Sequence, residues 1–285
     1  MSGQIRTGGI GTRLSAVAAL FSLTLFPTGL SALETTTLKA TYAIAIGTAV
    51  VGHANVECLF AGDSYAATIT GSTGGVSRLV SDARARLSGS GHISGTKVLP
   101  ATFNQETMER GFGTYVSMAM KGGKITNLVA VPSLSAAPDR VPVTPRHKTG
   151  IVDPLGAFIV PVAHGGPVSG RATCDRTINI FDGWTRFDVR LFYKQTKAVD
   201  GGDGKYAGRI IVCGAHYVPV AGHRSHADSL NDLLDDNRLE VWLAPVEKKN
   251  LLVPYRILIG TRLGDVIVYA TRFTTDATEE RASAE

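Results

Sequence analysis

The sequence predicts a mostly β protein built on one large curved antiparallel sheet, a β-spiral or half-barrel, with two short helices. Apolar and polar residues alternate in short runs along nearly the whole chain, which indicates strands with one buried face. Glycine accounts for 32 of 285 residues, about 11% against a usual ~7%, which is typical of many turns. No regular alternation of strands with helices occurs, so a parallel sheet is excluded.

The first half of the chain predicts strands joined by tight turns. In residues 38–46, the side chains of Leu38, Ala40 and Tyr42 share one face. Residues 76–87 fit both a helical spacing and an alternation, and we expect a helical turn that runs into a strand. Gly122-Gly123 is typical of a hairpin turn. The expected strands cover residues 38–46, 51–60, 65–70, 97–108, 113–120 and 124–131.

The middle of the chain predicts a crossing segment followed by the first helix. Residues 132–145 contain four prolines, which exclude a helix or a central strand. Asp153 suits the N-cap and Pro154 the first position of a short helix within 151–160. A loop rich in glycine and proline follows at 163–170. If the domain is divided at all, residues 132–150 are the expected boundary.

The second half of the chain again predicts strands. Asp182-Gly183 is a hairpin dipeptide. In the run after it, Phe187, Val189 and Leu191 are expected to face a core, with the charged residues between them on the other face. An acidic helix is expected at 228–236, and a polar tail at 275–285. The expected strands cover residues 177–181, 186–191, 206–220, 238–244, 252–259 and 265–274.

The first 32 residues predict a secretory signal peptide. Arg6 and Arg13 precede an apolar run at 14–26, and small residues follow it at Ser31 and Ala32. Cleavage there would release a periplasmic domain covering residues 33–274 and the tail, with no transmembrane span. An uncleaved anchor is the alternative, but the run is short for the ~30 Å hydrocarbon layer of a membrane.

The charge of the chain is mildly positive. The net charge is +5, and removing the two arginines of the signal peptide leaves 5 − 2 = +3. The basic residues are scattered, without a run of five. Nucleic-acid binding is therefore excluded as an expectation.

Export would allow the three cysteines to form a disulfide. Sequence alone does not fix the pairing. Cys174 with Cys213 is preferred because both lie in neighbouring elements of one half, and the bridge would contribute roughly 4 kcal/mol by loop entropy. Cys58 would then be free, either as a small buried residue or as a reactive thiol. No His or Lys lies within three residues of it, which favours the buried alternative.

The motifs of common enzymes are missing from the sequence. Residues 71–75 and 165–170 do not fit a serine nucleophile turn, and no phosphate loop or dinucleotide fingerprint occurs. We therefore predict neither a catalytic residue nor a cofactor. The alternative is a metal-dependent hydrolase, for which His216, His223 and His226 would have to converge on one point. Exposed histidines in a polar loop would explain the same cluster without a metal.

Two further groups of residues are candidates for a binding site. A half-closed sheet with a helix over its mouth would leave an apolar groove. Its candidate lining residues, which could equally be ordinary core, are Phe158, Trp184, Tyr217, Trp242 and Tyr255. A candidate polar face consists of Asp182, Arg186, Asp188 and Arg190. Asp182 and Asp188 could form an acid–base pair, or Asp182 a hairpin turn and Arg186 with Asp188 a surface ion pair.

Short motifs along the chain together show a resemblance to a known family. They are Tyr42 with Gly47 and Gly52, residues 138–144, Asp153-Pro154, residues 181–183 with 186–188, residues 217–222, residues 242–245 and residues 253–256. In this order, over residues 38–274, the chain resembles the exported family of domain of unknown function 3108 of alphaproteobacteria. The resemblance implies a curved periplasmic sheet that binds or supports rather than catalyses. Cys174 and Cys213 fall where relatives carry a cysteine pair.

The sequence therefore predicts an exported envelope protein that is not an enzyme. It would bind a protein partner, a lipid or a cell-wall component in envelope maintenance. A protein partner would need an exposed sheet edge. An apolar ligand would need an internal cavity of at least ~300 Å³.

Overall fold

The computed structural model describes residues 3–4, 8, 35–75, 81–133, 139–163, 170–202, 204–224, 238–261 and 264–276. Residues 33–285 form one compact unit. Several predictions lie wholly or mostly outside the described residues. They are the signal peptide apart from residues 3, 4 and 8, the helical turn at 76–80, the loop at 163–170, the acidic helix at 228–236 and the polar tail at 275–285.

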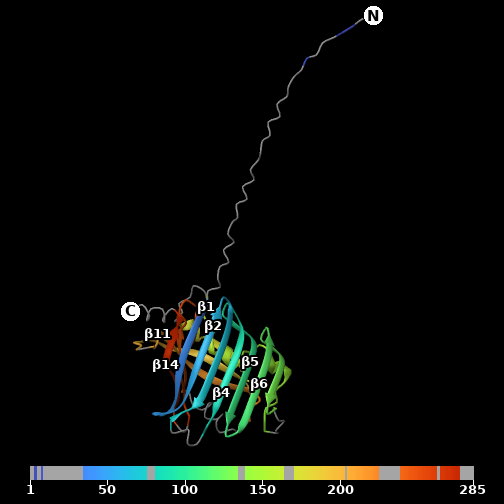
Figure 1. The fold of residues 1–285 in the computed structure, drawn as a ribbon. Coiled ribbons are helices and arrows are strands. Elements are labelled where there is room, and N and C mark those ends of the chain that lie inside the picture. The colour runs from blue at the N-terminus through green and yellow to red at the C-terminus, as the bar shows by residue number, and fades with distance from the viewer. Residues whose placement is uncertain are drawn as a thin grey trace. The chain divides into compact units, whose positions relative to one another are not determined.

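One antiparallel sheet of 14 strands makes up the fold, which confirms the mostly β class and the single large sheet (Figure 1). The strands follow each other in the order β7-β6-β5-β4-β3-β2-β1-β14-β13-β12-β11-β10-β9, and β8 pairs with β13. Their bounds are β1 (Thr35–Ile46), β2 (Ala49–Ala61), β3 (Ser64–Thr73), β4 (Arg84–Ser94), β5 (Lys97–Glu109), β6 (Phe112–Lys121), β7 (Lys124–Val131), β8 (Val160–Pro161), β9 (Arg176–Phe181), β10 (Arg186–Val199), β11 (Gly208–Ala221), β12 (Leu239–Pro245), β13 (Leu251–Ile259) and β14 (Val266–Thr275).

The first and last strands of the domain lie side by side in the middle of this sheet. Ala40 of β1 stands opposite Phe273 of β14, and both side chains are buried in the core. This ladder joins the two halves of the chain. The proline-rich segment 132–150 therefore links the two outer edges of one sheet rather than two separate sheets.

Alternation along each strand builds the core on the concave side of the sheet. Leu38, Ala40 and Tyr42 of β1 are buried, and they pack with the buried residues Val56 and Phe60 of β2. Burying such side chains contributes roughly 1.5–3 kcal/mol each before opposing terms. The inner face of the curved sheet therefore holds the apolar core of the unit.

Residues 149–152 fill the gap between the two outer strands, β7 and β9. The amide of Ile151 donates to the carbonyl of Gly123 in the β6–β7 turn over 3.1 Å. On the other side, the amide of Val152 donates to the carbonyl of Asn179 in β9 over 2.8 Å, and the Phe181 amide donates back to Val152 over 3.0 Å. This seam takes the place of a direct ladder between β7 and β9 in the described ranges.

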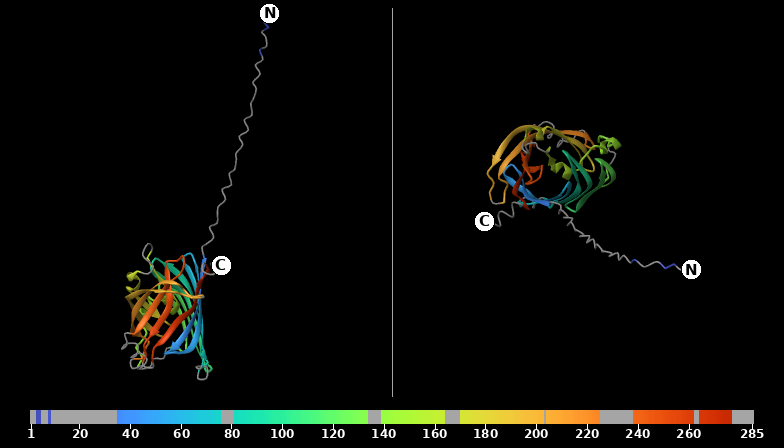
Figure 2. Two further views of the ribbon diagram at one scale, coloured as in Figure 1. Left: turned by 90° about the vertical axis from the view of Figure 1, so that its left-hand side faces the viewer. Right: turned by 90° about the horizontal axis from the view of Figure 1, so that it is seen from above.

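Helices are few and short in the part of the chain that the structure describes. The helix α1 (Pro154–Phe158) confirms the expected helix within 151–160, and two short 3₁₀ segments, Pro145–Lys148 and Arg171–Cys174, accompany it. The view from above shows the strands running around α1, which packs against β4, β5 and β9 (Figure 2). No described helix has the length and apolar character needed to cross a membrane.

Strand β4 extends well beyond Leu87, where the alternation of apolar residues ends in the sequence. Glycines occupy its next inner positions because larger side chains have no room there. A Cβ on Gly89 would lie 3.2 Å from Leu155 Cδ1 of α1, and one on Gly91 would lie 2.5 Å from the carbonyl oxygen of Leu99. Because these inner positions carry glycine, the apolar alternation that marks a strand stops at Leu87, and the sequence pattern does not show the rest of β4.

Candidate ligand-binding cavities

An apolar cavity of ≈ 240 Å³ lies between α1 and the inner face of strands β9 to β13. The helix contributes Pro154, Ala157 and Phe158. The strands and the segment after α1 contribute Val160, Ile178, Ile180, Val189, Leu191, Ala215, Leu239, Glu240, Val241, Leu243, Pro254 and Ile257. All of these residues except Glu240 are apolar, so the wall offers almost nothing to water.

Strand register brings the lining residues of this apolar cavity to one face. Val189 stands opposite Ile178, and Leu191 stands opposite Ala215 on the other neighbouring strand. Residues directly opposite each other in a ladder project to the same side of a sheet. The alternation at Val189 and Leu191, which predicted a core-facing side for this strand, is thus what builds the cavity wall.

The helix α1 is a wedge between the two sides of the sheet. Leu155 is buried and packs toward β4 and β5, whereas Phe158 lines the apolar cavity. Phe158 also meets the ring of Tyr42 edge-on, with 6.3 Å between centroids. Pro154 at the first position suits a helix start because its missing N–H would have no partner there.

Asp153 caps α1 from a fully buried position, with 0% of its surface exposed. Its Oδ1 accepts the amides of Leu155 at 2.8 Å and Gly156 at 3.0 Å. Its Oδ2 has no hydrogen-bond partner among the described residues, and neither has the buried hydroxyl of Tyr65. Removal from water raises the pKa of Asp153 to about 6, although the two backbone hydrogen bonds oppose the shift.

A second cavity, called the end cavity here, opens at one end of the sheet and has a volume of ≈ 830 Å³. It lies between the β4–β5 and β6–β7 turns, residues 150–163 and the start of β9. Val160 and Ile178 line both this cavity and the apolar one, so the two cavities are neighbours. The charged residues that line it in the described ranges are Lys97, Arg171, Asp175 and Arg176.

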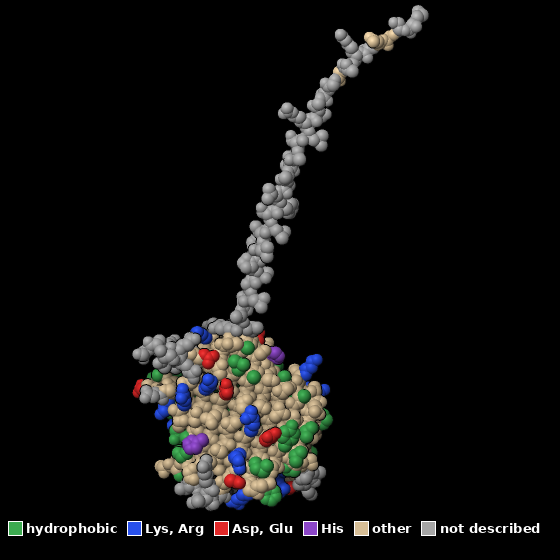
Figure 3. All heavy atoms as spheres, in the orientation of Figure 1, with side chains coloured by type: hydrophobic (Ala, Val, Ile, Leu, Met, Phe, Trp, Pro, Cys, Tyr) green, Lys and Arg blue, Asp and Glu red, His purple; other side chains and the backbone are tan. Residues whose placement is uncertain are grey.

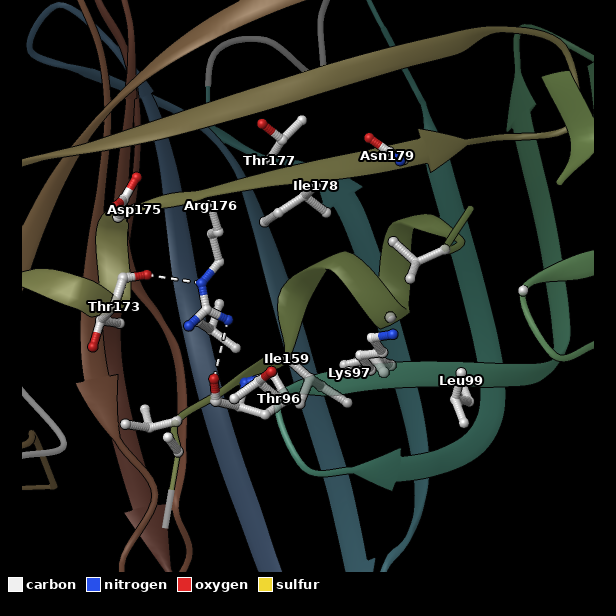
Figure 4. Close-up of a pocket in the computed structure, with 18 of the residues that line it drawn as sticks. Thr96, Lys97, Leu99, Ile159, Thr173, Asp175, Arg176, Thr177, Ile178 and Asn179 are labelled. Atoms are coloured by element: carbon white, nitrogen blue, oxygen red, sulfur yellow. Dashed lines mark hydrogen bonds between the residues drawn. The ribbon is translucent and has the colours of Figure 1, made fainter. Parts of the chain in front are cut away.

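Arg176 points into the end cavity from β9 (Figure 4). Its Nε donates to the carbonyl of Thr173 over 2.8 Å, and its Nη1 donates to the carbonyl of Pro161 over 3.0 Å. Burial lowers the pKa of this guanidinium, since loss of water disfavours the charged form. The side chains of Asp175 and Thr177 project to the other side of the strand in the same view. The sequence pattern did not single out Arg176, although it shares an alternating face with Ile178.

A third hollow of ≈ 820 Å³ lies at the opposite ends of the strands and is lined by small side chains such as Gly52, Gly71 and Ala85. Phe112 on its rim is 81% exposed. Other exposed apolar side chains occur nearby on β5 and β7, at Met108, Val129 and Val131. In the space-filling view, hydrophobic side chains gather toward the lower right, whereas charged ones are scattered (Figure 3).

The five aromatic residues expected to line one groove lie in different surroundings. Phe158 alone among them is part of the apolar cavity wall. Tyr217 packs on Phe187, with ring centroids 5.1 Å apart. Tyr255 belongs to a core trio with Tyr206 and Phe273. The single aromatic groove is therefore not the arrangement found in the described residues.

The two tryptophans of this set have polar surroundings. Trp242 lies between Lys197 and Arg256, each 4.7 Å from the centroid of its ring. Trp184 in the β9–β10 turn donates its Nε1 hydrogen to the carbonyl of Pro132 over 2.8 Å. Both rings therefore make structural contacts that alternation in the sequence does not reveal, since each depends on a residue far away in the chain.

The expected polar face is divided between a turn and a strand. Asp182 Oδ1 accepts the amides of Trp184 at 2.8 Å and Thr185 at 2.6 Å, so Asp182 shapes the hairpin. Arg186 Nη1 lies 2.5 Å from Asp188 Oδ1, but the arginine is buried rather than on the surface as expected. The Nη1 of Arg186 also donates a hydrogen bond to the carbonyl of Phe187. Arg190 is exposed.

The described residues do not assemble the expected metal site. His216 is exposed and stacks on Phe192, with ring centroids 4.9 Å apart. His223 is half-buried after the end of β11, and His226 lies outside the described residues. Within the described ranges, no group of three His, Cys, Asp or Glu side chains is placed to hold a metal ion.

Cys174 and Cys213 form a disulfide, the pairing that the sequence favoured. The bridge fastens the 3₁₀ segment Arg171–Cys174, beside the end cavity, to the buried face of β11. Cys58 is free and buried. Burial raises the pKa of its thiol to about 12, and the charge of Glu57 adds to the shift.

Comparison with known proteins places the chain in a family. A search of curated proteins found no match. Among solved structures, the chain is similar to a beta-barrel-like protein of domain of unknown function DUF1849 from Brucella abortus. The identity is 10%, the match covers 84% of this chain and 98% of that chain, and the TM-score is 0.48. The family model described as "Protein of unknown function (DUF3108)" matches residues 39–271, and the chain belongs to that family.

Proposed function

We propose that this protein is an exported, non-catalytic binding protein of the cell envelope, and that it holds an apolar chain, such as the acyl chain of a lipid, in the apolar cavity. One observation carries the proposal: all lining residues of that cavity except Glu240 are apolar. An open cavity with such a lining gains free energy when an apolar group covers it and displaces water.

The size of the cavity favours a single chain as ligand. Its ≈ 240 Å³ is smaller than the ~300 Å³ that we expected for an apolar ligand, but larger than the ~150 Å³ cavity that holds benzene. One acyl chain or a similar apolar group suits this volume. A lipid with two acyl chains is larger than the cavity, so most of its atoms would remain outside it.

Features elsewhere in the chain support the envelope and the carrier-like form of the proposal. The basic and apolar pattern of residues 1–32 suits export, and a disulfide suits an oxidising compartment. A strongly curved sheet with an inserted helix suits the half-barrel that the sequence suggested. A binding role is supported by the lining of the apolar cavity, which suits contact with an apolar group.

Native mass spectrometry of the protein purified from its own periplasm tests the proposal. We expect a mass above that of the mature chain, and we expect organic extraction to remove the excess. Ala215→Leu should lower the bound fraction, because Ala215 lines the cavity and the larger side chain takes up its volume. Ala66→Leu is the matched control, since Ala66 is exposed on β3. An unliganded mass, or equal occupancy of the two variants, would contradict the proposal.

A protein partner is the second candidate function. The exposed side chains of Val129 and Val131 lie on β7, an outer strand of the sheet, and strand addition uses such edges. An unliganded mass in the experiment above, followed by crosslinking of the protein through β7, would favour this candidate. The metal-dependent hydrolase alternative gains no support from the described residues.

A further inference from the structure

The inner face of β9 changes character along its length. Arg176, Ile178 and Ile180 alternate on it, with Arg176 in the end cavity, Ile180 in the apolar cavity and Ile178 in both. A strand rises ~3.3 Å per residue, so the charged and the apolar ends of this row are about 13 Å apart. One row of side chains on β9 thus runs from a cation to a pocket whose lining residues are apolar except for Glu240.

The charges around the end cavity favour an anion. Lys97, Arg171 and Arg176 line it, and Asp175 is the one carboxylate among its described lining residues. The view of the cavity shows the Asp175 side chain turned away from Arg176 (Figure 4). Neither Arg176 nor Lys97 has an ion-pair partner in the described ranges. The cavity therefore carries a positive charge that its own wall does not neutralise.

Arg176 is the residue best placed to bind an anionic group. Its two hydrogen bonds to backbone carbonyls hold the guanidinium in place, and a guanidinium has five N–H donors in all. Three donors therefore remain for a ligand. Keeping such a cation half-buried without a counter-charge is costly, and a carboxylate or phosphate would offset that cost.

We infer that the two cavities form one site for an anionic single-chain amphiphile, with its head group on Arg176 in the end cavity and its chain in the apolar cavity. This inference rests on the proposed function, and it adds the chemical class of the ligand. A carboxylate and a phosphate share the chemistry that Arg176 recognises, so a fatty acid and a single-chain phospholipid are both sources of such a ligand.

Titration calorimetry of the purified protein, freed of bound ligand on a hydrophobic resin, tests the inference with four ten-carbon probes. These are decanoate, decyl phosphate, decanol and decyltrimethylammonium. We expect both anions to bind more tightly than decanol, and the cation to bind most weakly. Arg176→Gln should weaken the binding of both anions by about tenfold or more, since it removes charge-assisted hydrogen bonds, and leave decanol binding unchanged.

Two variants serve as controls for folding and for charge. Arg190→Gln removes a charge from an exposed position on the neighbouring strand β10 and should leave all four affinities unchanged. Arg176→Lys keeps the charge without the fork of donors and should retain part of the affinity for anions. Melting curves of each variant confirm that the fold is intact.

The outcomes separate this inference from the proposed function. If decanol and decanoate bind equally well, or if Arg176→Gln weakens both alike, the head-group site is refuted and the apolar cavity stands. If decyltrimethylammonium binds as tightly as decanoate, the inference is equally refuted. If none of the four probes binds, the proposed function itself fails.

Discussion

Asp153 is a carboxyl group that the fold removes completely from water. The cost of this burial is reduced by the two amides that Oδ1 accepts at the start of α1, but Oδ2 has no partner in the described ranges. The sequence marked Asp153 only as a helix cap. Its burial could not be foreseen, because it depends on α1 lying inside the sheet rather than on the surface.

The stability of the protein should depend on the protonation of Asp153. Its pKa is about 6 in the folded protein against an ordinary value of 3.8, so the folded state binds the proton more tightly between these values. Protonated Asp153 therefore adds to the free energy of unfolding, by an amount on the order of 3 kcal/mol. This stabilisation is fully present below about pH 4 and is lost as the pH rises through 6.

The substitution Asp153→Asn tests this dependence. The amide oxygen still accepts the two backbone amides but carries no charge at any pH. Urea unfolding at pH 4, 5, 6 and 7 should show the wild-type unfolding free energy falling relative to that of the variant as the pH rises. Parallel pH profiles of the two unfolding free energies would contradict a raised pKa of Asp153 in the folded protein.

Cys58 should be chemically inert in the folded protein. Its thiol is buried, and the raised pKa of about 12 leaves almost no reactive thiolate at neutral pH. Iodoacetamide at pH 8 should therefore label Cys58 only after denaturation, with Cys174 and Cys213 still linked in non-reducing mass spectrometry. Rapid labelling of the native protein would contradict its burial.

At the scale of elements, the local sequence pattern predicted where most strands lie along the chain, but not which distant segments pack against them. Alternation is a property of consecutive residues, so β1, β2 and β5 to β7 could be read directly from it. The dipeptide Asp153-Pro154 likewise predicted α1. The seam at 149–152 depends on two strands that are distant in the chain, and no local signal marks it. The same reason explains why the position of Trp242 between two cations was not foreseen, and why Arg176 was missed.

The wedge formed by α1 should be essential to stability, and Leu155→Ala should destabilise the fold by about 2–5 kcal/mol. Leu155 is fully buried beside Gly89 of β4, so the truncation leaves a void between helix and sheet. Chemical denaturation measures the loss. Leu59→Ala on β2 is the matched control, since this side chain is 42% exposed and its truncation should change stability by less than about 0.5 kcal/mol. Equal effects of the two substitutions would disprove the wedge.

At the scale of the whole molecule, the sheet is strongest at its centre and weakest at its seam. Each central strand has a ladder on both sides, whereas β7 has a full ladder only with β6. Single contacts tie it to the rest of the fold, such as the bond from Ile151 to the Gly123 carbonyl and the bond from Trp184 to the Pro132 carbonyl. Opening at this line would therefore cost less than opening the long ladders that β2 makes with β1 and β3.

Native-state hydrogen exchange should reveal this difference. Amides of β7 should exchange well before those of β2, because opening β7 breaks one ladder whereas opening β2 breaks two. The substitution Trp184→Phe removes the bond to Pro132 and should speed exchange in β7 without affecting β2. Uniform protection across both strands would mean that the seam is as stable as a continuous ladder.

The place of β14 beside β1 bears on how the protein is made. A ribosome delivers β1 first and β14 last, yet the finished sheet sets them next to each other. Until the end of the domain has been synthesised, β1 has β2 as its sole partner and an unsatisfied edge on its other side. Such an edge is a template for pairing with other chains, and long-range closure is slow. The middle of the sheet is thus the last part to be assembled, and the newborn chain is exposed to aggregation for as long as its final strand is missing.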